Sequence, residues 1–287
     1  MRSKLTSLLL LVILLISACA PQAAPAPTTE PTLAVSTATT VPPTETPAPR
    51  TLTVLAAASL TDSFNEMGKL FESKNPGVAV AFNYAGSQVL AQQLDQGAPA
   101  DVFASASPKY MNAAVTSKRV NQSDSKNFVK NRLVVIFPKD NPTGLKTLQD
   151  LAKPGLKIDL EDKSVPAGQY SLDFLDKAVK DPDFDPKFKD NVLKNVVSYE
   201  TDVKAVVSKV SLGEADAGIV YITDYNVAVD KLGKLDIPDS LNTVATYPIA
   251  PIADSKNPEL AKAFVALVLS PEGQAIMAKY GFVTATP

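Results

Sequence analysis

The sequence predicts an α/β protein of two lobes built on mostly parallel sheets. Strand-like and helix-like segments alternate from Thr51 onward, an order typical of sheets whose parallel strands are joined by helices. The first strand-like segment is a continuous apolar run, as expected for a parallel strand covered on both faces. The 237 residues that follow Arg50 (287 minus 50) are too many for a typical single small hydrophobic core, and this length suits two lobes.

In the first half of the chain, residues 51–57 form that continuous apolar run and predict a buried strand. Residues 60–74 carry apolar side chains at helical spacing, and the Pro-Gly pair at 76–77 ends this helix. The alternation continues with a strand at 78–82, a helix at 89–96, a strand at 101–104, a helix at 108–118 and a strand at 133–137.

The second half repeats this pattern. Further strands are predicted at 156–160, 196–199, 217–222 and 247–252, and further helices at 170–180, 203–212, 258–269 and 271–280. We expect the chain to cross to a second lobe near Asn131 and to return near Tyr247. Lobe 1 then comprises residues 51–131 plus 247–287, and lobe 2 comprises residues 132–246.

The first residues predict export. Arg2 and Lys4 precede an apolar run at 5–16, which at roughly 12 residues is shorter than the ~20 needed to span a bilayer. A basic start followed by a short apolar run is typical of a secretory signal. The stretch ISAC, ending at Cys19, resembles a lipobox, which implies that residues 1–18 are a signal peptide and that Cys19 carries lipid. An uncleaved anchor or a chance cysteine are the alternatives.

Residues 19–50 predict a tether between membrane and folded domain. Pro, Thr and Ala supply 23 of the 31 residues from 20 to 50, so little apolar surface is available for a core. An ordinary disordered linker is the alternative. We expect an extracytoplasmic, membrane-anchored lipoprotein, on the periplasmic side or at the cell surface.

The composition narrows the chemistry. Cys19 is the only cysteine, so no intrachain disulfide can form, and no thiol is left for catalysis if Cys19 carries lipid. The chain has no histidine, the commonest general base and metal ligand. Loss of residues 1–18 removes two basic residues and no acids, so the mature charge is 26 minus 30, or −4. This balance gives no indication of nucleic-acid binding, and we expect a monomer without a cofactor.

Five turns that follow predicted strands offer donors for an anion. Ligands of parallel α/β sheets bind at the carboxyl ends of strands, where helix starts expose unpaired N–H groups. Ser59 and Asp62 form a capping signal in the first turn, and Gly86 in the second allows an unusual backbone angle ahead of another hydroxyl. The candidate donors are Ser59, Ser87, Ala167, Val203 and Tyr221. Helix caps, a plain Pro-Gly turn and a core tyrosine remain alternative interpretations.

Six sequence motifs, taken in their order along the chain, resemble those of a known family. The strings AAASLTDSF, YAGSQVLAQQLDQGAPADVFASAS, VPAG, ETDVK, GIVYITD and YGF resemble the periplasmic molybdate-binding proteins of ABC importers over residues 51–283. The resemblance implies a periplasmic-binding-protein type II (Venus flytrap) fold, with the oxyanion between the lobes and permease subunits as partners. Gly86 departs from the pattern, because another serine can stand there.

The resemblance also implies roles for the five residues. Ser59 and Ser87 would each give an N–H and a hydroxyl, Ala167 and Val203 an N–H each, and Tyr221 its phenol, with no direct metal ligand. These seven donors suit a dianion, since a hydrogen bond to a charged group contributes roughly 1.5–3 kcal/mol. A pocket without a carboxylate would leave the proton of hydrogen phosphate unpaired, which disfavours phosphate. Molybdate and tungstate are nearly the same size, so we expect no strong preference between them.

The sequence leaves several alternative functions open. A receptor for sulfate or another tetrahedral oxyanion is the nearest alternative. Tyr221 and Tyr225 could suggest a ferric-iron receptor, although no histidine accompanies them. Asp173, Asp176 and Asp202 could be imagined as acid–base groups of a secreted enzyme, and a surface lipoprotein without a ligand would be favoured by loss of Ser59 or Ser87.

Overall fold

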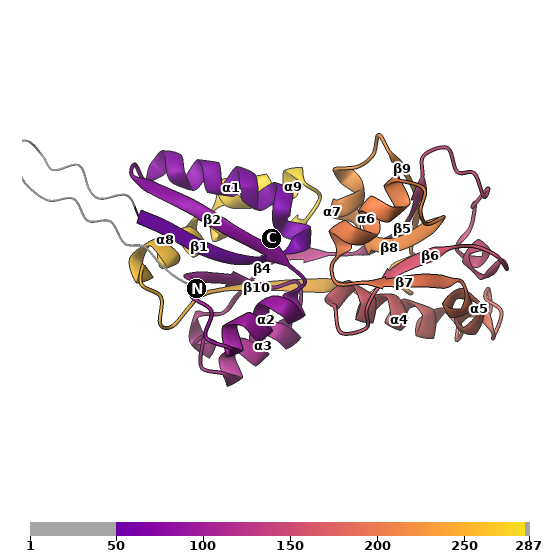
Figure 1. Ribbon diagram of the computed structural model, residues 1–287, viewed down its shortest axis with the longest axis horizontal. Coiled ribbons are helices and arrows are strands. Elements are labelled where there is room, and N and C mark those ends of the chain that lie inside the picture. The colour runs from indigo at the N-terminus through magenta and orange to yellow at the C-terminus, as the bar shows by residue number, and fades with distance from the viewer. Residues whose placement is uncertain (1–49, 285–287) are drawn as a thin grey trace, which may run out of the picture. The chain divides into compact units, whose positions relative to one another are not determined.

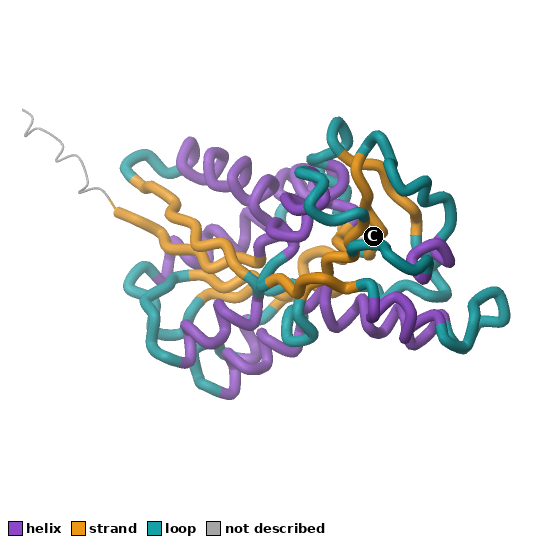
Figure 2. The backbone as a smooth tube through the Cα atoms, turned by 45° about the vertical axis from the view of Figure 1, so that its right-hand side comes forward, coloured by secondary structure: helices purple, strands orange, loops and turns teal. Residues whose placement is uncertain are grey.

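The computed structural model describes residues 50–284. The proposed signal peptide, Cys19 and nearly all of the tether lie outside these residues. Within the described range the strands form a six-stranded sheet, in the order β11-β4-β10-β3-β1-β2, and a five-stranded sheet, in the order β7-β6-β8-β5-β9. Helices cover both faces of each sheet (Figures 1 and 2). The predicted α/β class with two lobes is confirmed.

The first sheet holds the N-terminal β–α units and the C-terminal segment. Its strands are β1 (Arg50–Ala57), β2 (Val78–Ala85), β3 (Val102–Ala104), β4 (Lys126–Asn131), β10 (Ala245–Pro251) and β11 (Val283–Thr284). Its helices are α1 (Thr61–Lys74), α2 (Ser87–Asp95), α3 (Pro108–Thr116), α8 (Pro258–Leu269) and α9 (Pro271–Lys279). The helices α1 and α9 lie on one face, and α2 and α3 on the other (Figure 1). The Phe264 ring of α8 packs edge-on against the Phe64 and Phe71 rings of α1.

The second sheet holds the middle of the chain. Its strands are β5 (Leu133–Pro138), β6 (Ile158–Glu161), β7 (Val196–Glu200), β8 (Ala217–Tyr221) and β9 (Leu232–Asp236). Its helices are α4 (Pro166–Ala178), α5 (Phe188–Lys194), α6 (Val203–Ser211) and α7 (Ile222–Asn226). Short 3-10 turns are η1 (Ala58–Leu60), η2 (Gln122–Asp124) and η3 (Leu148–Ala152).

The sheets are mixed, which corrects the prediction of mostly parallel strands. The pairs β1–β2, β1–β3, β6–β7 and β6–β8 are parallel. The pairs that involve β10, β11 or β5 are antiparallel. The reason lies in the connections between the sheets. The chain enters β5 and β10 from the opposite sheet, so each of these strands runs antiparallel to its neighbours.

Two connections join the sheets. Arg132 alone separates β4 of the first sheet from β5 of the second, and residues 237–244 lead from β9 back to β10. Since these segments bring the carboxyl ends of β1, β2, β6 and β8 towards each other, the turns that follow those strands can share one site. Over residues 50–284 no single helix is long and apolar enough to cross a membrane. The helices α8 and α9 meet the length and composition criteria only when they are taken together, and this pair is bent by 62°.

Candidate functional site

A small cavity lies where the turns of the two sheets meet. Its volume is about 10 Å³, and all five sequence-predicted donors line it: Ser59, Ser87, Ala167, Val203 and Tyr221. The lining also contains backbone and side chains of Ala57, Ala58, Gly86, Ala106, Glu161, Val165, Pro166 and Asp202. Pockets for drug-sized ligands span roughly 300–1,000 Å³, so this cavity suits a small ion better than a sugar or a peptide.

Ser59 lies in η1, directly after β1, and its hydroxyl does not cap a helix. Its Oγ is 2.9 Å from the Tyr247 Oη, and no side-chain cap hydrogen bond is present at the start of η1 or of α1. Asn131 Nδ2 donates to the same Tyr247 Oη over 3.4 Å. Because Tyr247 accepts from Asn131, it can donate to Ser59, which leaves the Ser59 proton free for a ligand. The alternative interpretation, in which Ser59 only caps its helix, is therefore wrong.

Ser87 is the first residue of α2 and is 1% exposed. Its Oγ accepts a hydrogen bond from the Ala106 N–H over 2.9 Å, so its own proton is also free to donate. Gly86, immediately before it, has φ −58°, which corrects the expectation of an unusual backbone angle. The requirement for glycine is steric: a Cβ there would lie 2.3 Å from the Thr201 carbonyl oxygen of the opposite turn.

Ala167 and Gly168 lie in the first turn of α4, after Pro166. Pro at the first helical position has no N–H, so the amides of the next residues are the first free donors of this helix. One of them is already engaged, because Gly168 N–H donates to Glu161 Oε2 over 3.1 Å. Glu161 is 4% exposed and lines the cavity. The prediction of a pocket without a carboxylate is therefore wrong.

Val203 is the first residue of α6, and Asp202 is its N-cap. The Asp202 carboxylate accepts from the N–H groups of Lys204 and Ala205, over 2.9 and 3.2 Å. This cap leaves the Val203 N–H without a side-chain acceptor among the described residues. Asp202 thus has a structural role, although its turn also lines the cavity.

Tyr221 ends β8 and places a buried hydroxyl at the cavity. Its side chain is 2% exposed, and its Oη has no hydrogen-bond partner among residues 50–284. Burial, followed by the nearby Tyr247 and Glu161, raises the pKa of Tyr221 well above its usual value. The phenol therefore stays protonated and can donate. A buried donor without a partner costs about 1–3 kcal/mol, which a ligand acceptor would remove.

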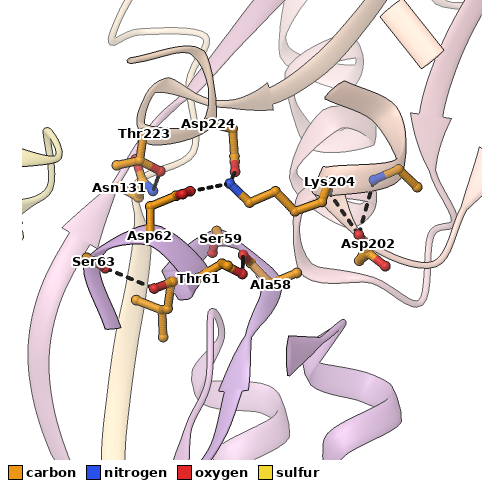
Figure 3. A network of polar contacts seen from close by, with 12 residues as sticks. Ala58, Ser59, Thr61, Asp62, Ser63, Asn131, Asp202, Lys204, Thr223 and Asp224 are labelled. Carbon is orange, nitrogen blue, oxygen red and sulfur yellow. Dashed lines mark hydrogen bonds and ion pairs between the residues drawn. The ribbon is translucent and has the colours of Figure 1, made fainter. Parts of the chain in front are cut away.

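Contacts between the two sheets surround the cavity. Lys204 Nζ lies 2.8 Å from Asp62 Oδ2 of α1 and 3.3 Å from Asp224 Oδ1 of α7 (Figure 3). Asp224 is fully buried, so this ammonium is its neutralising partner. Gln88 Nε2 also donates to the Thr201 carbonyl over 3.0 Å. These contacts hold the turns of both sheets around one small cavity.

The rival chemistries find little support in this geometry. Tyr225 does not line the cavity, and residues 50–284 contain no cluster of three or more Asp, Glu, His or Cys side chains that could hold a metal ion. Asp173 and Asp176 lie on α4, outside the cavity lining. Glu161, Tyr247 and Asn131 were not predicted as site residues.

Comparisons with known proteins agree with the fold. The family described as bacterial extracellular solute-binding protein matches residues 52–283. The chain is 36% identical over 233 residues to the molybdate-binding protein ModA of Mycobacterium tuberculosis H37Rv, a match that covers 81% of this chain and 84% of the relative.

Two solved structures have a similar fold. The periplasmic molybdate-binding protein of Azotobacter vinelandii has a TM-score of 0.70 at 20% identity, covering 81% of this chain and 98% of that chain. The sulfate-binding protein SubI of M. tuberculosis H37Rv has a TM-score of 0.74 at 17% identity, covering 83% and 88%. The two structures support the fold. The family match and the mycobacterial relative confirm the resemblance that the sequence motifs indicated.

Proposed function

Because the chain belongs to the family of bacterial extracellular solute-binding proteins, we propose that it captures molybdate or tungstate and delivers the oxyanion to the membrane subunits of an ABC importer. The predicted donors are Ser59, Ser87, Ala167, Val203 and Tyr221. They bind the oxygen atoms of the anion, and the metal inside it needs no protein ligand. The molybdate-binding relatives support this choice of solute.

One observation carries the proposal: the buried Tyr221 hydroxyl, without a partner among the described residues, borders the same cavity as the hydroxyls of Ser59 and Ser87. A dianion loses much hydration on burial. Hydrogen bonds to a charged group return roughly 1.5–3 kcal/mol each, so several convergent donors can offset that loss. No lysine or arginine lines the cavity, which leaves uncharged donors to hold the anion.

Sulfate is the second candidate, because the sulfate-binding protein SubI shares the fold. Titration calorimetry with molybdate, tungstate, sulfate and phosphate separates the two candidates. We expect one molybdate or tungstate per chain with similar affinity, weaker sulfate, and no turnover of any of them. Sulfate or phosphate binding more tightly than molybdate would refute the assignment.

Closure of two lobes is part of the proposed mechanism. We assign residues 51–131 and 247–287 to one lobe and residues 132–246 to the other, with the two connections between the sheets as the hinge. The Lys204–Asp62 ion pair and the Gln88–Thr201 hydrogen bond join the lobes in the closed form. Small-angle scattering should show a more compact protein with molybdate than without it; identical curves would contradict a hinge.

Membrane attachment through Cys19 completes the proposal. Cleavage before Cys19 and lipidation of its thiol would anchor the chain, with residues 19–50 as a tether. Mass spectrometry of the mature protein should find a lipid-modified N-terminal Cys19, and Cys19→Ser should release the protein from the membrane fraction. Continued membrane retention of this variant would argue for an uncleaved anchor instead.

A further inference from the structure

Glu161 is a buried carboxyl group in the wall of an anion site. It is the last residue of β6, is 4% exposed and lines the cavity. Its Oε2 accepts from the Gly168 N–H at the start of α4. A carboxylate at this place occupies a helix N-terminus that an incoming dianion would also use.

The charges around Glu161 are unfavourable for a dianion. Asp202, at the N-terminus of α6, lines the same cavity. The charges of Asp202 and of the fully buried Asp224 of α7 both raise the pKa of Glu161. Lys204 on α6 is the cation in contact with Asp224, and it is shared with Asp62. Tyr221 on β8 is neutral, and the start of α4 contributes amides without a charged side chain.

We propose that Glu161 carries a proton whenever the oxyanion is bound, so that capture is coupled to proton uptake and Glu161 becomes a specificity-determining residue of the site. This inference rests on the proposed function. The proton comes from solvent and adds to one carboxylate oxygen. The other oxygen keeps its bond from Gly168, and the new O–H can donate to the anion.

The electrostatics of the site support this coupling. Burial, with the nearby carboxylates of Asp224 and Asp202, raises the pKa of Glu161 well above its usual value, against the opposite effect of the Gly168 and Ala167 amides. A bound dianion raises that pKa further. Affinity is then greatest below the pKa of Glu161 in the empty protein, and it falls as pH rises from that pKa towards the pKa in the complex.

Protonation of Glu161 also affects the selectivity of the site against phosphate. Protonated Glu161 is a donor on this side of the cavity, so the proton of hydrogen phosphate finds no acceptor there. Ionised Glu161 is an acceptor, and hydrogen phosphate can donate to it. Discrimination against phosphate should therefore weaken at alkaline pH in the native protein.

The experiment measures molybdate affinity between about pH 6 and pH 9, where unperturbed carboxyl, tyrosine and lysine side chains do not titrate. The chain has no histidine. Burial raises the pKa of Asp159, also in β6, to about 7, so the Glu161→Gln variant supplies the background that Asp159 contributes. We expect the dissociation constant to rise with pH, by up to about tenfold per pH unit. Calorimetry in buffers of different ionisation enthalpy should count up to about one proton taken up per anion.

Three variants locate the proton. Glu161→Gln should bind molybdate with an affinity independent of pH and without proton uptake. Asp162→Asn removes the neighbouring carboxylate, which pairs with Ser164 outside the cavity lining, and should keep the native pH dependence. Asp224→Asn tests the other buried acid. It should keep a pH dependence, shifted to lower pH because the Asp224 carboxylate no longer raises the pKa of Glu161.

The outcomes are distinct. A flat affinity with no proton uptake in the native protein overturns the coupling even if Glu161→Gln does not fold. A pH dependence that survives in Glu161→Gln but disappears in Asp224→Asn overturns the assignment to Glu161. No molybdate binding at any pH refutes the proposed function itself.

Discussion

Tyr247 Oη lies 2.9 Å from Ser59 Oγ, although 188 positions separate the two residues in the chain. The contact connects β10, which returns from the second sheet, to the turn after β1. Tyr247 also contacts the Tyr221 ring edge-on, with centroids 5.8 Å apart. Tyr247 therefore lies behind two of the proposed donors without lining the cavity, which makes it a positioning residue.

Tyr247→Phe should weaken molybdate binding. The Ser59 hydroxyl loses the donor that orients it, and its proton becomes free to turn away from the ligand. With a typical net hydrogen-bond contribution of about 1 kcal/mol, we expect an affinity loss of roughly fivefold by calorimetry. Tyr280→Phe is the matched control, because its hydroxyl pairs with Glu66 away from the cavity. Equal effects of both changes would contradict the role of Tyr247.

Tyr221→Phe should have opposite effects on stability and on binding. In the empty protein it removes a buried hydroxyl that has no partner among the described residues, so the free energy of unfolding should stay equal or rise. In the complex it removes a hydrogen bond to a charged group, about 1.5–3 kcal/mol, or roughly 10- to 150-fold in affinity. Denaturant unfolding and calorimetry check the two effects separately. A loss of stability without a loss of affinity would assign Tyr221 to the core alone.

Asp62→Asn should speed release of the anion with little effect on stability. The change breaks the Lys204–Asp62 pair between the sheets and leaves Lys204 with Asp224. The Asp62 side chain is 41% exposed, so the pair contributes about 0.2–1 kcal/mol and dissociation should accelerate up to about fivefold. Stopped-flow measurement of release checks this.

Lys204→Met is the informative contrast to that variant. It leaves the fully buried Asp224 without its cation, which should lower the free energy of unfolding by about 3–5 kcal/mol. A stability equal to that of Asp62→Asn would show that Asp224 does not depend on Lys204.

Gly86→Ala should prevent tight binding while each sheet stays folded. Its added Cβ would meet the Thr201 carbonyl oxygen at 2.3 Å, so the two turns could not approach as closely. We expect an affinity loss of about tenfold or more, measured by calorimetry. Gly97→Ala is the control: Gly97 has φ +85° and no atom near its missing Cβ. That change should cost about 1 kcal/mol of stability and leave affinity unchanged.

Some elements could not be predicted from the sequence. The strand β4 (KNFVKN) has no apolar run, and β9 (LGKLD) contains glycine and a charged residue, so neither shows a strand signal on its own. Both form because neighbouring strands supply their hydrogen-bond partners. Glu161 likewise gives no signal in the string DLED; only its place at the end of β6, before the VPAG turn, could have indicated a site residue.

The sequence by itself determined the β–α alternation, the five turns rich in small and hydroxyl-bearing residues, and the family resemblance. These features depend on side-chain periodicity and on residue types within a few positions of each other. The tertiary structure decided which hydroxyl protons are free, which carboxyl group is buried at the cavity, and that Gly86 serves a close approach. Such properties depend on partners far away in the chain, such as Tyr247 for Ser59, because hydrogen-bond satisfaction and charge state are set by the surroundings that folding assembles.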